Sequence, residues 1–289
     1  VRIFIIFHDC GHGSFFKSNK ANAIVGFITG VLTLTPYEHW RHDHAIHHAS
    51  VSNLDRRGVG DVMTLTVKEY LELPYFKKIG YRAMRHPLVL FLLGPPLLFI
   101  FGHRIARRGA GKRQRHSVYW TNIAIILILL IVTLTIGLRT YLLVQAPVFL
   151  IAFSVGVWLF YIQHQFKGTY WEKQENWDFE TAALKGSSFY KLPKLLKWFS
   201  GNIGFHHIHH LSPRIPNYNL EKCQNENTIF KDIKPISLLS SLKSIKLHLW
   251  DEEQRMLVGF KHLKTLKLDL VQKQAEVGNY FKQSEECRN

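Results

Sequence analysis

The sequence predicts an all-α integral membrane protein, in which a helical bundle carries a cytoplasmic helical cap with a histidine-rich metal site. Three histidine clusters indicate the site: HDCGH at 8–12, HAIHH at 44–48 and HHIHH at 206–210. Two long apolar runs between the second and third clusters indicate the bundle. Because helical residues three or four apart share a face, each cluster directs two or three imidazoles into one volume.

Length and composition favour one domain, covering residues 1–289, because no sequence repeat at a fixed period is present. Lys and Arg exceed Asp and Glu by 37 to 21, which gives a net charge of +16. Such a charge suits nucleic acid, anionic lipid headgroups or an acidic protein. The basic residues flank apolar runs, as at the cytoplasmic margins of membrane helices, and this pattern argues against nucleic-acid binding.

The three cysteines indicate neither a disulfide framework nor a thiolate zinc site, because they are odd in number and lack CxxC spacing. The first residues, VRIFIIF, are too short for the core of a signal peptide. We expect them to be the end of a membrane helix that is cut short.

Two apolar segments are predicted to enter the bilayer without a simple crossing. Residues 23–37 are shorter than the ~20 residues that a span requires. They are expected to dip and return, which keeps the first two histidine clusters on one side. Residues 87–102 are broken by Gly94, Pro95 and Pro96 and have basic flanks. We favour a re-entrant or interfacial hairpin with both ends in the cytoplasm over a true span.

Residues 118–138 and 141–162 are each about 20 residues long and apolar, so they predict two spans joined as a tight membrane hairpin, 118–162. The second span returns the chain to the cytoplasmic side and places the third cluster beside the first two. The cytoplasmic cap is expected from 39–86 and 164–289. Within it, helical periodicity is predicted for the stretch containing Leu238, Leu239, Leu242, Ile245 and Leu249.

The candidate metal ligands are eight cluster histidines and one histidine that follows the second span in YIQHQ: His8, His12, His44, His47, His48, His206, His209, His210 and His164. A structural zinc ion takes four ligands, so nine nitrogens are enough for two metals with open positions. Imidazole alone does not name the metal, but two redox-active irons fit this number best. No catalytic side chain beyond these ligands is predicted.

Other polar residues near the clusters have weaker signals. His42 and His207 lie inside the clusters but off the shared helical faces, and the histidines that stand singly are expected to be bystanders. Metal-bound imidazoles usually donate their second nitrogen proton to an oxygen. The candidate acceptors for such bonds are Asp9, Glu38, Asp43 and Asn202.

With HDCGHGSFF, WRHDHAIHHA, LDRRGVGD and SGNIGFHHIHHLSPRIPNY, the chain resembles the membrane fatty acid desaturases. That family has the pattern HxxxH, HxxHH and, after a pair of membrane helices, a second HxxHH. The resemblance is to the acyl-lipid branch, near the bacterial phospholipid desaturases, and covers essentially the whole sequence.

The resemblance implies a non-haem di-iron centre that uses O₂ to remove two hydrogens from an acyl chain of a membrane phospholipid. Two electrons would come from a donor such as ferredoxin, flavodoxin or cytochrome b5, and the nine histidines would be the iron ligands. Family members carry membrane helices upstream of the first cluster, and here only VRIFIIF precedes it. No HPGG haem motif of a fused cytochrome b5 domain is present.

Other functions remain open at this point. A related di-iron hydroxylase or ketolase uses similar ligands and resolves the substrate radical differently. A histidine-rich zinc transporter is a different class, but would place ionisable residues inside its spans. Only Arg139, between the two spans, is charged in 118–162. A zinc protease is disfavoured because HExxH is absent.

Overall fold

The computed structural model describes residues 1–265, and their regular structure is mainly helical, as the sequence predicts. The longer helices are α1 Arg2–His12, α2 Asn19–Leu32, α3 Tyr37–Ser50, α5 Tyr75–Met84, α7 Lys112–Thr135, α8 Leu138–His164 and α12 Asn217–Glu226. The short helices are α4 Val67–Glu72, α6 Gly94–Pro96, α9 Phe179–Lys185, α10 Lys194–Phe199, α11 His206–Leu211 and α13 Leu238–Ser241.

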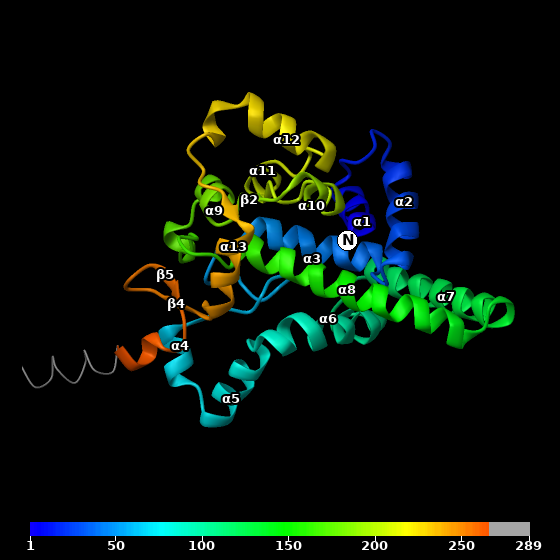
Figure 1. The fold of residues 1–289 in the computed structure, drawn as a ribbon, viewed down its shortest axis with the longest axis horizontal. Helices are drawn as coiled ribbons and strands as arrows, with labels where there is room; N and C mark the ends of the chain where they lie inside the picture. Colours follow the sequence, from blue (N-terminus) through cyan, green and yellow to red (C-terminus); the bar gives the residue numbers. More distant parts are fainter. Residues whose placement is uncertain (266–289) are drawn as a thin grey trace, which may run out of the picture.

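The predicted pair of long apolar helices is confirmed. Helices α7 and α8 have 24 and 27 residues and are long and apolar enough to cross a membrane. They reverse at Ile136 and Gly137, where Gly137 has φ +81°, a value that glycine adopts without a steric penalty. The hairpin projects from one side of the molecule (Figure 1), and the cap helices gather around its other end. The start of α7 and the end of α8 therefore lie on the same side.

The segment after α5 differs from the predicted hairpin, because the chain does not reverse at Gly94, Pro95 and Pro96. Helical dihedral angles continue through these residues, with π-helical turns at Leu88–Leu93 and Leu97–Phe101. Proline lacks an N–H, and a wider turn accommodates the missing hydrogen bonds. The bend lies earlier, where α5 and Leu88–Arg104 meet at 59°. This bent pair is either one broken span or a re-entrant loop, so re-entry stays a prediction.

Residues 23–37 form one helix and a turn rather than two arms. Helix α2 begins after Ser18, whose side chain accepts a hydrogen bond from the N–H of Ala21, and it ends at Leu32. The chain then turns through Leu34, which has φ +56°, into α3. Helix α2 packs along α1. That it dips into a bilayer stays a prediction.

The cap contains two small sheets that the sequence did not predict. Strand β1 (Leu65–Thr66) pairs in parallel with β4 (Leu249–Asp251), which pairs antiparallel with β5 (Met256–Val258). Strand β2 (Tyr190–Lys191) pairs in parallel with β3 (Ile236–Ser237). Leu249 therefore lies in a strand, and the helical prediction is wrong there. The part of the predicted cap beyond residue 265 lies outside the described residues.

An apolar cluster fixes the short helix that carries the third histidine cluster. Ile208 on α11 is fully buried against Phe205, Leu220 and Phe230. A second cluster, of Leu54, Trp171, Trp250 and Leu257, joins the loop after α3 to the β4–β5 sheet. Burial of such side chains contributes roughly 1.5–3 kcal/mol each, enough to hold a six-residue helix that would not form alone.

Candidate metal centre

Five imidazoles from three helices form the first histidine group. His8 and His12 lie four residues apart on α1, His44 and His48 lie four apart on α3, and His209 comes from α11. One ring nitrogen from each lies within 4.8 Å of those of the others. The Nε2 atoms of His44 and His48 are 3.1 Å apart, and those of His48 and His209 are 3.0 Å apart.

Four imidazoles form the second histidine group: His47 from α3, His164 from the end of α8, and His206 and His210 from α11. Their ligand atoms also lie within 4.8 Å of one another. The Nε2 atom of His164 is 3.2 Å from that of His47 and 3.1 Å from that of His206. His164 is therefore placed with the cluster histidines, although it belongs to none of the three sequence clusters.

The two groups are neighbours. The rings of His48 and His210, one from each group, stack with centroids 4.1 Å apart and planes at 13°. His206 and His209 also contact across the groups, with centroids 5.3 Å apart. Two metals held by these groups would therefore form a dinuclear site rather than two separate ones.

Burial favours the neutral form of at least four imidazoles of the site, those of His44, His47, His209 and His210. Eight of the nine rings are buried, and His12 is partly buried. Burial lowers the pKa of His44 and His210 well below the usual range, and the neighbouring imidazoles lower it further. Burial has the same effect on the pKa of His47 and His209. A neutral imidazole is the form that binds a metal, so the site is set for ligation at neutral pH.

The donor set fits metal ions. Two nitrogens bound to one metal at about 2.1 Å lie roughly 3.0–3.4 Å apart, and five pairs of Nε2 atoms within the groups are separated by 3.0–3.2 Å. Among the described residues, the buried Nε2 of His12 has no hydrogen-bond partner. A buried nitrogen without a partner costs about 1–3 kcal/mol, which a metal bond would remove.

Asp9 orients one ligand candidate. Its Oδ1 lies 3.0 Å from Nδ1 of His8, and its Oδ2 accepts bonds from the backbone N–H and the side-chain amide of Asn217 at 2.6 and 2.8 Å. With Nδ1 protonated toward Asp9, the lone pair of His8 lies on Nε2. On α8, Nδ1 of His164 lies 3.3 Å from the carbonyl oxygen of Gly186 and is fixed in a similar way.

The other candidate acceptors have different partners. Asp43 lies 3.6 Å from Arg107 and 4.0 Å from His39. Asn202 donates to the carbonyl oxygen of Asn217, so it supports the residue that holds Asp9. Glu38 pairs with Arg113 and Arg41.

The two off-face histidines lie outside both groups. His42 is exposed on α3. His207 is fully buried, but its Nε2 lies 2.9 Å from Oε1 of Gln224, and its ring packs against Phe189 and Phe230. Both provide controls within the sequence clusters.

Two aromatic residues and Asn217 contact the site without having been predicted from the sequence. Trp40 stacks on His44, with centroids 4.2 Å apart and planes at 18°. Phe160 packs against His47 and His164. Trp40 precedes His44 by four residues and Phe160 precedes His164 by four, so both contacts could have been predicted from helical spacing. The contact of Asn217 with Asp9 joins residues 208 apart and has no sequence signal.

Comparison with known proteins identifies the family. The family model for fatty acid desaturases matches residues 1–230. The chain is 50% identical over 269 residues to a fatty acid desaturase of Bacillus subtilis (strain 168), covering 93% of this chain and 76% of that protein. It is 27% identical over 276 residues to an sn-1 oleoyl-lipid 12-desaturase of Picosynechococcus, covering 90% of this chain and 76% of that protein.

A third relative is an sn-1 acyl-lipid omega-3 desaturase (ferredoxin) of Nostoc, 28% identical over 232 residues, which are 76% of this chain and 62% of that protein. The matched family region includes all three histidine clusters and His164. With the match to the family model and the Bacillus subtilis relative, this establishes that the chain belongs to the fatty acid desaturase family.

Proposed function

We propose that this desaturase introduces a cis double bond into the acyl chain of a membrane lipid, using O₂ and two electrons from a separate donor. The observation that carries the proposal is the convergence of nine imidazoles in two adjacent groups at the end of α8, an apolar helix long enough to span. Relatives named for acyl-lipid desaturation support the substrate class.

The two groups would hold one iron each, with the nine histidines as ligands. Nitrogen ligands suit iron, zinc, copper and nickel, and the family supplies the reason to choose iron. When bound, the iron pair would supply the O₂ activation and hydrogen removal that no acidic or basic side chain can perform.

The side chains around the groups would orient the imidazoles and exclude water. Asp9 fixes the ring of His8, while Trp40 and Phe160 cover His44, His47 and His164 with apolar rings. Burial, and then the neighbouring Asp9, raise the pKa of Cys10 to about 12, and this buried thiol belongs to neither histidine group.

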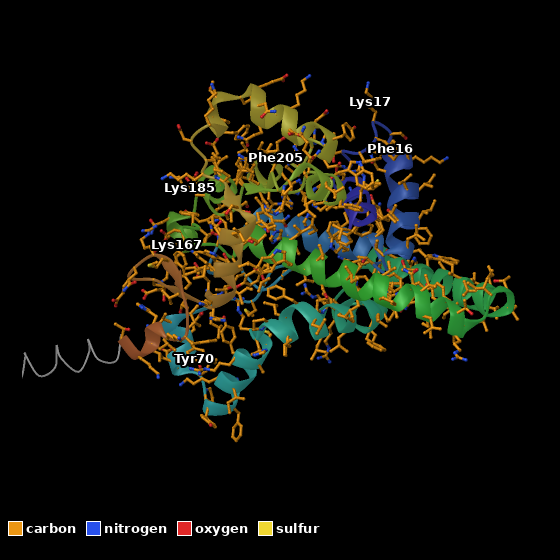
Figure 2. All side chains as sticks on the ribbon, viewed as in Figure 1. Phe16, Lys17, Tyr70, Lys167, Lys185 and Phe205 are labelled. Atoms are coloured by element: carbon orange, nitrogen blue, oxygen red, sulfur yellow. The ribbon has the colours of Figure 1, made fainter. Side chains whose placement is uncertain are left out.

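The histidine groups are proposed to lie at the cytoplasmic face of a multi-pass protein. The start of α7 is rich in Lys and Arg, as cytoplasmic helix ends are. Lys167 and Lys185 lie on the side of the molecule opposite the α7–α8 turn (Figure 2). An acidic donor would suit this basic side. Two relatives carry ferredoxin in their names, which supports a ferredoxin-type donor.

The test is expression in a host that lacks desaturases, with gas chromatography of its membrane lipids and iron analysis of the purified protein. We expect about two irons per chain and new unsaturated acyl chains. His209→Ala should abolish unsaturation and reduce bound iron while the protein still inserts. His42→Ala is the matched control, since His42 is exposed outside both groups and should keep both readouts.

The same chromatogram separates the alternatives. A hydroxylase or ketolase would yield oxygenated acyl chains in place of alkenes. Zinc bound without any lipid change would contradict the proposed chemistry and favour a carrier. Unchanged unsaturation in His209→Ala would refute the ligand assignment.

A further inference from the structure

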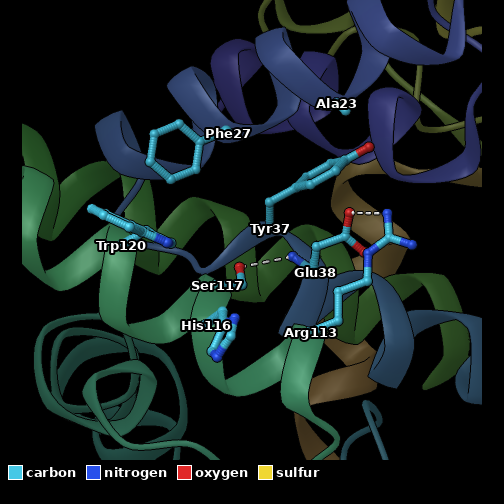
Figure 3. Close-up of a pocket in the computed structure, with 8 residues that line it drawn as sticks. All are labelled: Ala23, Phe27, Tyr37, Glu38, Arg113, His116, Ser117 and Trp120. Carbon is cyan, nitrogen blue, oxygen red and sulfur yellow. Dashed lines mark hydrogen bonds and ion pairs between the residues drawn. The ribbon is translucent and has the colours of Figure 1, made fainter.

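A groove of about 470 Å³ lies between α2, α3 and α7, apart from the histidine groups (Figure 3). Its lining residues are Ala23, Phe27, Tyr37, Glu38, Arg113, His116, Ser117 and Trp120. Along α3, the nearest ligand candidate is His44, six residues after the lining residue Glu38, or about 9 Å along the helix axis. None of the nine ligand candidates lines it.

Packing between α2 and α3 builds the floor of the groove. Tyr37 lies so close to Gly26 that a Cβ atom there would be 2.2 Å from the ring. The Tyr37 hydroxyl donates to the carbonyl oxygen of Cys10 at 2.6 Å, so the ring is fixed from both sides. Ala23 on α2 and Trp120 on α7 also line the groove, Ala23 near the hydroxyl end of Tyr37 and Trp120 near Phe27 (Figure 3).

The groove is apolar along one part and polar at one end. The rings of Phe27, Tyr37 and Trp120 form the apolar part, and Glu38, Arg113, His116 and Ser117 form the polar end (Figure 3). Nη2 of Arg113 lies 2.7 Å from Glu38, while the side chain of Arg113 is 72% exposed. A guanidinium has five N–H donors, so one paired nitrogen leaves others for an anion.

The groove lies where the headgroup layer of a membrane would meet its acyl layer. The polar end lies in the first turns of α7, beside Lys112 and Arg115, and the apolar part is one to two turns further along the predicted span. Trp120 and Tyr119 are 61% and 56% exposed, as aromatic residues at a membrane interface are. On α2, Ile24, Ile28 and Leu32 continue the exposed apolar surface.

We propose that this groove binds an anionic membrane phospholipid, with one acyl chain against Ala23, Phe27 and Trp120 and the phosphate at Arg113. The volume lies within the range of small-molecule sites, about 300–1,000 Å³, and the combination of apolar walls with a few polar groups is typical of them. The excess of basic over acidic residues around the start of α7 complements an anionic headgroup.

Native mass spectrometry of the protein purified in mild detergent tests the proposal, with phosphatidylglycerol and phosphatidylcholine as probes. We expect one retained lipid per chain and a preference for phosphatidylglycerol. Ala23→Trp should fill the groove and abolish retention. Ile28→Trp adds the same side chain to an exposed position on the same helix outside the lining, so it should retain the lipid.

Arg113→Gln should weaken phosphatidylglycerol binding by about tenfold and remove the preference over phosphatidylcholine. Lys112→Gln, which removes a neighbouring charge outside the lining, should reduce the preference much less than Arg113→Gln. Ala23→Leu, a smaller change, replaces Ala23→Trp if the latter lowers the melting temperature.

Equal lipid retention in Ala23→Trp, Ala23→Leu and Ile28→Trp would overturn the groove assignment. The proposal would also be overturned if the protein were a dimer that carries no lipid and if Ala23→Trp dissociated that dimer, since a second copy would then cover the groove. Lipid retention should be unchanged in His209→Ala. A failure of lipid binding in the groove can therefore be told apart from a failure of the proposed desaturation.

Discussion

The guanidinium of Arg85 donates a hydrogen bond of 3.0 Å to the side chain of Gln165, the residue that follows His164. Arg85 is only 2% exposed, and it also donates to the carbonyl oxygens of Leu247 and Met63. Gln165 in turn donates to Thr64 at 3.0 Å. One buried cation thus connects the end of α8, the loop before β1 and the chain before β4, beside the second histidine group.

Arg85→Ala should lower the free energy of unfolding by about 3 kcal/mol, because it leaves the buried side chain of Gln165 without its donor and removes bonds to two partly buried carbonyl oxygens. The release of Gln165 should also reduce metal bound by the second histidine group. Denaturant unfolding in micelles and metal analysis measure the two effects. Arg82→Ala is the control, since this residue is exposed, donates a hydrogen bond to Tyr70 and stacks on Phe260 at the surface, so its loss should cost much less. Similar losses in both variants would contradict the role of Arg85.

Asp9→Ala should weaken metal binding by about 10–100-fold, as removal of an oxygen partner of a ligating histidine typically does. The ring of His8 would lose the bond that fixes its tautomer. Competition with a chelator measures the affinity. Asp43→Ala is the control, because the Asp43 carboxylate contacts His39 and Arg107 instead of a ligand candidate. The metal affinity of this variant should stay near that of the parent. Affinity unchanged in Asp9→Ala would show that Asp9 does not orient a ligand.

The stability of the metal-free protein should fall as the pH decreases below about 6.5, in part because of His207. Burial lowers the pKa of His207 to about 4, whereas an unfolded histidine has a pKa of about 6.5. Between these values the unfolded state binds the extra proton. The contribution is therefore complete above pH 6.5 and is lost toward pH 4, at up to about 1.4 kcal/mol per pH unit.

Unfolding free energies between pH 7.5 and 5 test this dependence. His207→Gln should have a shallower slope than the parent, because it removes one buried imidazole and the other histidines remain. His42→Gln changes an exposed residue of the cluster on α3 and serves as the control. Equal slopes for the parent and His207→Gln would contradict the prediction.

Gly204→Ala should destabilise the protein by about 1–3 kcal/mol, since an added Cβ would lie 2.3 Å from the carbonyl oxygen of Tyr190. Gly204 immediately precedes Phe205 and α11, so the variant should also disturb the third histidine cluster. Thermal unfolding and metal content report both effects. Gly80→Ala on α5 meets no atom of residues 1–265 within 4 Å and should be neutral or stabilising by up to about 1 kcal/mol. A neutral Gly204→Ala would show that this close approach is not required.

The sequence predicts those parts of the fold whose signals are local. The two spans are predictable because a long apolar run indicates a membrane helix whatever packs against it. In the structure, α7 begins a few residues before the first predicted span, and α8 ends a few residues after the second. The strands were missed because segments of two or three residues have no detectable period. The path of residues 88–104 was not predicted, because Gly94, Pro95 and Pro96 usually indicate the end of a helix. In the structure the helix continues through them with wider, π-helical turns on either side.

The sequence alone determined which nine imidazoles are available, because helical spacing directs them from each cluster and a span delivers His164 to the same side. Only the tertiary structure decided how they divide. His47 and His48 are consecutive, yet they belong to different groups, because neighbouring helical residues point about 100° apart and α11 presents partners to both faces. That division depends on how α1, α8 and α11 pack around α3, which is set by contacts between residues far apart in the chain.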